Sequence, residues 1–592
     1  MGTETTVVLV DGQSRPRLIP STRFTLALLV FFAFIVQYSQ RVNLPIAIVC
    51  MVNRTKPIQH YLSFDVTTAL PNDILETASH SSVTTKPTNI LMQKGGIFQE
   101  KQYYWSELQQ QLLLGGYWAG YIFTQIPALP NDILETASHS SVTTKPTNIL
   151  MQKGGIFQEK QYYWSELQQQ LLLGGYWAGY IFTQIPGGWF ATNIGVKWVY
   201  AGSLGTSSLA TLALTIMYMM SNTHFILAFV LRCIIGLAHG VLFPATVSLW
   251  SLWAVPQERS TLASIGFCGT HLGTSLTMLF GGLLCRYVYS GWMYLFVITS
   301  ILGFLWLILW IALTADSPQQ HKRISNHERD YICRLTGSTG KKRMMSLASL
   351  PWKNIIKSKP VNALIITHIA NLFGLFFFLT NLGKISNELL RIPPQSTGYL
   401  LCSGFFLTLL CSLSSGIVAD HLVRANKITL TNARRLFNSL ASFIPVLCMI
   451  SFYFCDNSRQ MLGIITILVY LASSGFAYGS GFVVNFADVV PAFSGVIFGV
   501  ANTFASLAGL IGNIVAGLII KKPVLEQWRK LYIMFGIVYF IGGLVYVIYG
   551  SAIPRKWATF QAVNNSAKQE QKLDAEEAIP MNANVQANKS IE

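Results

Sequence analysis

Twelve apolar segments, each long enough to cross a lipid bilayer, recur along this chain of 592 residues. A membrane-spanning helix needs about 20 apolar residues, because a helix satisfies its own backbone polar groups inside hydrocarbon. Six segments on each side of a polar stretch predict an all-α membrane protein with twelve transmembrane helices in two pseudo-symmetric six-helix bundles. The expected spans cover residues 24–52, 167–190, 196–220, 225–250, 261–284, 292–314, 361–383, 396–419, 435–455, 460–484, 492–520 and 530–552.

The composition supports a membrane protein and excludes several other classes. Only 11% of the residues are charged, against about 25% in soluble domains, and 52% are apolar. A disordered protein, a nucleic-acid-binding protein or a soluble enzyme is therefore not expected. The formal net charge of +17 is explained by basic cytosolic loops. The nine cysteines lie mostly inside apolar runs, without the spacing of disulfide or zinc sites.

The basic residues predict which side of the membrane each loop occupies. The N-terminal tail, the polar stretch after the sixth span and the loop around Arg424 are all rich in Lys and Arg. With twelve spans these regions share one side, which the positive-inside rule assigns to the cytosol. We expect a cytosolic tail over 1–23, a six-helix bundle over 24–314, a basic cytosolic loop over 315–360, a second bundle over 361–552 and a disordered cytosolic tail over 553–592.

An internal repeat complicates this topology. Residues 69–127 and 128–186 are identical over 59 positions, and each copy ends in an apolar stretch of membrane-spanning length. The second copy runs on into Gly187, whereas the first runs into a polar sequence. A thirteenth span would also place the N-terminal tail opposite the other basic loops. We therefore predict that the second copy supplies the second span and that Leu108–Pro127 belongs to an extra duplicated segment in the first outer loop.

Charged residues inside the expected spans are candidates for function, because a charge is costly in hydrocarbon. Arg41 lies in the first span and Arg232 in the fourth, and His239 follows Arg232 by two helical turns on the same face. A guanidinium binds paired carboxylate or phosphate oxygens, so these residues favour a small anionic substrate. The alternatives are that the arginines brace backbone carbonyls and that His239 packs as a neutral ring instead of coupling protons.

Other candidates are weaker. His271 and His368 lie in the fifth and seventh spans and are expected to be packing or gating residues. No Walker sequence, metal-ligand cluster or catalytic spacing occurs in the chain. We therefore expect no cofactor, no metal and no enzymatic activity. Because no ATP-binding sequence occurs, we expect any transport to be coupled to a gradient of H⁺ or Na⁺.

Six motifs occur in order on the expected spans and loops. They are GYIFTQIPGG at 179–188, WSLWAVPQERSTL at 250–262, DSPQQHKRISNHERDYI at 316–332, GIVADHLVR at 416–424, NFADVVP at 485–491 and GVANTF at 499–504. Together they resemble the anion:cation symporter family of the major facilitator superfamily. That family includes sialin, the vesicular glutamate transporters and the type I sodium–phosphate cotransporters, and the motifs are closest to those of sialin. The resemblance covers about residues 20–555.

The resemblance implies an anion site between two bundles that rock in alternating access. Residues of the first, fourth and seventh spans are then expected to bind the substrate: Tyr38, Arg41, Asn43, Arg232 and Asn371. The resemblance also implies proton coupling, but sialin-like members carry Glu at the positions of Ile235 and His239. Only His239 can replace these acids here.

Two further departures bear on the substrate. Vesicular glutamate transporters carry a second substrate arginine at the position of Asn371 and a histidine at that of Leu173. With both absent, charge counting favours a monoanion over dicarboxylate glutamate. Charged residues near the cytosolic loops are expected to form ion pairs that open and close a gate: Glu258 with Arg259, and Asp420 with Arg424. Asp488 is a further candidate for this gate.

These observations predict a secondary active transporter of small organic or inorganic anions in a lysosomal, vesicular or plasma membrane. Its partners would be a monocarboxylate, sugar acid or phosphate and the surrounding lipid, without nucleic acid. One alternative is a sodium-dependent phosphate- or urate-type carrier at the plasma membrane. Another, from a different class, is a non-transporting receptor or scaffold that keeps the transporter fold.

Overall fold

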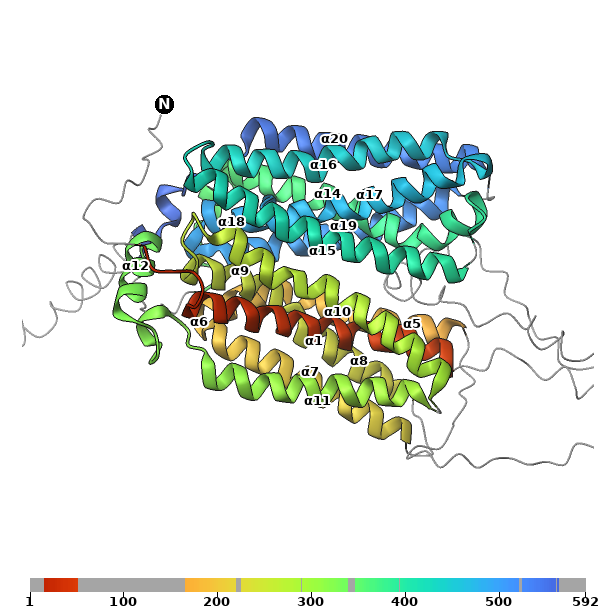
Figure 1. Ribbon diagram of the computed structural model, residues 1–592, viewed down its shortest axis with the longest axis horizontal. Helices are drawn as coiled ribbons and strands as arrows, with labels where there is room; N and C mark the ends of the chain where they lie inside the picture. Colours follow the sequence, from red (N-terminus) through yellow and green to blue (C-terminus); the bar gives the residue numbers. More distant parts are fainter. Residues whose placement is uncertain are drawn as a thin grey trace, which may run out of the picture.

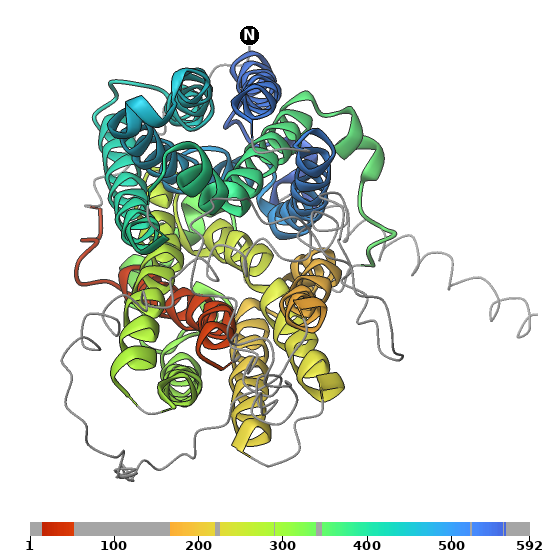
Figure 2. The same ribbon diagram turned by 90° about the vertical axis from the view of Figure 1, so that its right-hand side faces the viewer.

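The molecule consists of two bundles of long helices that lie side by side with their axes roughly parallel (Figures 1 and 2). A computed structural model describes residues 15–51, 166–219, 225–288, 290–338, 346–392, 394–520, 524–560 and 562–563. All regular elements of these residues are helical, which confirms the predicted all-α class.

The first bundle contains the helices before residue 314. They are α1 (Thr22–Met51), α5 (Glu166–Phe182), α6 (Gln184–Asn193), α7 (Val196–Met219), α8 (Phe225–Gly240), α9 (Leu242–Trp253), α10 (Arg259–Tyr287) and α11 (Gly291–Leu313). The α5–α6 and α8–α9 pairs each continue nearly end to end, so a single expected span is built from two helices in both cases.

The second bundle contains α14 (Lys359–Lys384), α15 (Pro394–Arg424), α16 (Leu430–Phe454), α17 (Gln460–Gly479), α18 (Phe482–Val489), α19 (Ser494–Ile519) and α20 (Leu525–Tyr549). A π-helical turn over Ile385–Leu389 ends α14. Between the bundles, the expected basic loop contains α12 (Asn326–Thr336) and α13 (Trp352–Lys357). We call the end of the molecule at which α12 lies, on the left in Figure 1, the α12 end.

Ten helical segments within the described residues are long and apolar enough to cross a membrane. The other two expected spans are also helical. Helix α10 is 29 residues long but rich in Gly, Ser and Thr, and α5 has 17 residues. Large apolar side chains point outward from the bundles, including Ile308 and Leu309 on α11 and Ile537 on α20. Such exposed apolar faces suit contact with lipid and mark a multi-pass membrane protein.

The second copy of the repeat provides α5, which packs against α8. The two backbones approach closely at glycines, because a Cβ atom on Gly179 would meet the carbonyl of Cys233 and one on Gly236 would meet the carbonyl of Tyr176. Small residues at helix crossings are typical of membrane bundles. The first copy, including Leu108–Pro127, lies outside the described residues.

Two expectations about particular residues were wrong. The cysteines were expected to form no disulfide, but Cys285, near the end of α10, is disulfide-bonded. Arg434 lies in the stretch after Arg424 that was expected to form a basic loop, but it is part of α16 and its side chain is completely buried. In both cases the residue itself can be recognised in the local sequence, but the residues that contact it are distant in the chain and cannot.

Candidate functional site

A cavity lies between the two bundles, lined by residues from both. Its volume of about 110 Å³ is room for several waters, since a single water needs about 10–15 Å³. Polar or charged lining residues come from α1, α5, α10, α14, α17 and α19; among them are Tyr38, Arg41, Tyr180, His271, His368, Tyr478 and Asn502. The rest of the lining is largely apolar.

Arg41 brings positive charge into this cavity. Its guanidinium carbon lies 4.3 Å from the ring centre of Trp177 and 4.8 Å from that of Tyr38. The residue is 8% exposed. Aromatic faces attract a guanidinium, so these two rings stabilise the position of the Arg41 side chain.

Arg232 has a different place. It lies outside the set of cavity-lining residues, and its two terminal nitrogens donate to the carbonyl oxygens of Gln40 and Arg41, both at 3.3 Å. Pro45 lies inside α1 and has no N–H to give the carbonyl four residues earlier, which is that of Arg41. The Arg232 side chain supplies a donor at this break. The signal available in the sequence was Pro45, four residues after Arg41 in an apolar span, because a proline there leaves the Arg41 carbonyl without its helical donor.

The other residues predicted for the site lie behind the cavity wall. His239 is completely buried, with one ring nitrogen 3.3 Å from the Tyr176 hydroxyl and the other 3.3 Å from the Gln40 side-chain oxygen. Asn43 donates to the Thr299 hydroxyl at 3.4 Å. Asn371 donates to the Thr367 carbonyl at 3.0 Å. Of the residues predicted for substrate binding, Tyr38 and Arg41 line the cavity.

Sequence reasoning missed several polar lining residues, among them Tyr180, Tyr478 and Asn502. The Asn502 amide donates to the Gln184 side-chain oxygen at 2.8 Å and so joins the two bundles. Gln184 belongs to the motif at 179–188 and Asn502 to the motif at 499–504, and these motifs were the available signal. Tyr180 belongs to the same motif as Gln184, whereas Tyr478 had no signal, because tyrosines in apolar spans are common.

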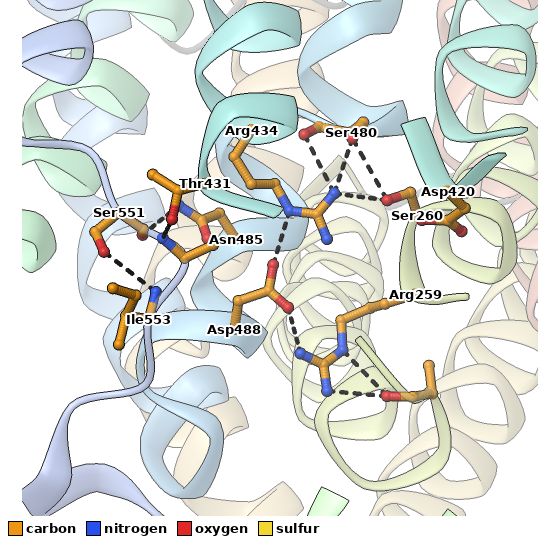
Figure 3. Close-up of polar contacts among 12 residues, drawn as sticks. Arg259, Ser260, Asp420, Thr431, Arg434, Ser480, Asn485, Asp488, Ser551 and Ile553 are labelled. Atoms are coloured by element: carbon orange, nitrogen blue, oxygen red, sulfur yellow. Dashed lines mark hydrogen bonds and ion pairs between the residues drawn. The ribbon is translucent and has the colours of Figure 1, made fainter. Parts of the chain in front are cut away.

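At the α12 end, a buried network of charges connects the bundles (Figure 3). Asp488 on α18 binds Arg259 of the first bundle with one oxygen and Arg434 of the second, at 2.7 Å, with the other. Arg434 also donates to the Ser260 hydroxyl at 2.6 Å. These side chains are at most 3% exposed. Arg259 was predicted to pair with Glu258, which is wrong, because its partner is Asp488 across the bundle interface.

Asp420 also crosses the interface. Its carboxylate accepts a hydrogen bond at 2.7 Å from the Thr261 backbone N–H, in the first turn of α10. A carboxylate at a helix N-terminus stabilises the unpaired N–H groups and the helix dipole there. The predicted pair of Asp420 with Arg424 is wrong, because Arg424, four residues further along α15, is exposed and forms no ion pair with Asp420 among the described residues.

Glu258 binds within the first bundle. It pairs with Arg15 and, at 2.7 Å, with the completely buried Arg23. Arg23 also lies 3.1 Å from Glu328 of α12, whose carboxylate accepts from the backbone N–H groups of Thr22 and Arg23, both at 3.2 Å. Glu328 therefore attaches α12 to the start of α1.

The sequence matches the model of the Major Facilitator Superfamily over residues 141–512. The chain belongs to this superfamily. It is 33% identical to human sialin over 402 residues, which cover 67% of this chain and 78% of sialin. It is 28% identical to a zebrafish (Danio rerio) vesicular glutamate transporter 3 over 407 residues, which cover 68% of this chain and 67% of that protein.

Further relatives agree with this placement. A putative inorganic phosphate cotransporter of Drosophila ananassae is 30% identical over 432 residues, covering 72% of this chain and 86% of the relative. The proton:xylose symporter XylE has a TM-score of 0.50 at 14% identity, covering 75% of this chain and 95% of XylE, and so shares the fold. The chain is thus a member of the anion:cation symporter family of the superfamily, as its motifs predicted.

Proposed function

We propose that this protein is a secondary active transporter of small anions that works by alternating access. The observation that carries the proposal is the position of Arg41, in a cavity that both bundles line, against the faces of Trp177 and Tyr38. A guanidinium held in a partly apolar cavity recognises carboxylate or phosphate through two parallel hydrogen bonds. The vesicular glutamate and phosphate relatives are named for anionic cargo.

Within this proposal, Tyr38 and Arg41 bind the substrate directly. Arg232 positions Arg41 by holding the backbone of α1 at its proline break. Asn43, His239 and Asn371 act as supporting residues behind the wall. The absence of a second arginine at the position of Asn371 favours a monoanion by charge counting, such as a monocarboxylate or a sugar acid, and phosphate is a further candidate substrate.

The network at the α12 end is the proposed gate on that side. Contacts that join Asp488, Arg259 and Arg434 close it, and they must break when the bundles rock apart. Transport needs no bound cofactor and draws on a gradient of H⁺ or Na⁺. We place both chain termini in the cytosol and the protein in a lysosomal, vesicular or plasma membrane, where it transports a solute and catalyses no chemical reaction.

The test is uptake into proteoliposomes of the purified full chain. Labelled sialate, glucuronate, urate, glutamate and phosphate are offered under separate proton, sodium and voltage gradients. We expect at least one anion to accumulate under one gradient, and Arg41→Ala to abolish that accumulation. Arg329→Ala is the matched control, because this arginine is partly exposed on α12 and its described ion pair is with exposed Asp330.

A second candidate is a sodium-dependent phosphate- or urate-type carrier, which the phosphate cotransporter relative favours. Accumulation of phosphate or urate under the sodium gradient alone would select it. Folded protein that moves none of the five anions under any gradient would reject both candidates and leave a receptor or scaffold with the transporter fold.

A further inference from the structure

Two histidines face the cavity from opposite bundles. His271 lies on α10 of the first bundle and His368 on α14 of the second, and both line the cavity together with Arg41. They are 8% and 3% exposed. If the bundles rock about this cavity, the two rings move relative to each other, so a ligand that contacts both is sensitive to the state of the transporter.

Each ring keeps one nitrogen without a hydrogen-bond partner among the described residues. This atom is Nε2 in His271 and Nδ1 in His368. A buried polar atom usually has a partner, and an exception in a cavity indicates where a ligand or water binds. His239 differs, because both of its ring nitrogens have partners and it lies behind the wall.

The neighbours of the two rings are mainly aromatic. The His271 ring centre is 5.6 Å from that of Tyr478 on α17 and 6.4 Å from that of Phe405 on α15. The His368 ring centre is 4.9 Å from that of Phe482 on α18 and 5.1 Å from that of Phe498 on α19.

The other titratable or charged groups of the described lining come from several helices. They are Tyr38 and Arg41 on α1, Tyr180 on α5 and Tyr478 on α17. From α20, Tyr539 reaches the carbonyl of Asn371, one turn beyond His368. Apolar surroundings favour a neutral imidazole, and an anion that arrives beside it favours the protonated ring, which donates from both nitrogens. Anion binding and proton binding at this pair are therefore linked.

We propose that His271 and His368 bind the substrate anion from opposite bundles and take up the co-transported proton when the anion binds. This inference rests on the proposed function and assigns its proton-coupling site. It moves that site away from His239, the histidine that the sequence favoured, to two residues that the sequence treated as packing or gating residues.

The experiment measures proton uptake when an anion binds to the purified full chain in weakly buffered detergent, with a pH-indicator dye. Sialate, glucuronate, urate, glutamate and phosphate are added one at a time, and binding is measured in parallel by calorimetry. We expect about one proton taken up per anion bound. His271→Gln and His368→Gln should each weaken binding about tenfold or more, and at least one should abolish proton uptake.

Controls make the outcomes distinct. His421→Gln, on the exposed last turn of α15, should leave binding and proton uptake unchanged. His271→Asn and His368→Asn are measured as well, so that a Gln variant that unfolds in a thermal melt does not decide the result. Proton uptake that is lost in His239→Gln and kept in the variants of both cavity histidines would overturn the inference.

Two further results would also decide against it. If the unaltered protein binds an anion without taking up a proton, the inference fails while the proposed function stands. If it neither binds nor transports any of the five anions, the proposed function itself fails, and the inference fails with it.

Discussion

The cavity and the network at the α12 end use buried arginines in opposite ways. In the network, Arg259 and Arg434 share the carboxylate of Asp488, so each guanidinium has an ion-pair partner that is part of the protein. In the cavity, the guanidinium of Arg41 lies against the rings of Trp177 and Tyr38, and we propose that it also attracts the substrate anion. Burial of an arginine therefore identifies neither a binding site nor a structural pair until its surroundings are known.

The largest expected effect comes from removing the shared carboxylate. Asp488→Ala leaves two buried guanidinium groups without their common partner, which should cost about 3–5 kcal/mol of stability. We expect a clearly lower midpoint in thermal unfolding of the purified protein in detergent.

Asp330→Ala is the control, because this carboxylate is exposed and pairs with an exposed arginine, and its midpoint should stay unchanged. A midpoint for Asp488→Ala equal to that of the unaltered protein would remove the contrast between the two regions.

The second effect should appear in transport and leave stability nearly intact. Arg41→Lys keeps the charge but loses the planar fork and its stacking on Trp177. Anion uptake should fall about tenfold or more, while the thermal midpoint changes little. If the variant instead unfolds easily and the folded fraction transports normally, Arg41 is a structural residue like those of the network.

A smaller effect is expected for the gate. Asp420→Asn keeps an acceptor for the Thr261 N–H but removes the charge that the α10 N-terminus attracts. The maximal uptake rate should change about 2- to 10-fold, with the substrate concentration at half-maximal rate nearly constant. Equal turnover in variant and parent would show that this contact has no part in the gate.

The smallest expected effect tests how Arg41 is held. Pro45→Ala restores a backbone donor for the Arg41 carbonyl, so Arg232→Gln should destabilise this variant less than it destabilises the parent. A double-mutant cycle measured by thermal or denaturant unfolding should give a coupling of about 1 kcal/mol. Additive effects would mean that Arg232 does not compensate for the proline.

The sequence alone predicted the all-α class and the helical segments, because the length and hydropathy of a membrane span are local properties. It also predicted the family, because each of the six motifs is a continuous stretch of sequence. It also singled out Arg41, since a charge in a span is recognisable without a structure. The family resemblance added Tyr38 as a second candidate for substrate binding. It placed Arg259 and Asp488 near the gate but did not pair them with each other.

Only the tertiary structure decided which polar residues share one environment. Tyr478 and Asn502 are far from Arg41 in the chain, and the packing of the two bundles brings them to one cavity. The same packing buries Arg434 beside Asp488, although its local sequence is that of a basic loop. Hydropathy sums over neighbours along the chain, whereas charge pairing and cavity lining depend on contacts between distant helices.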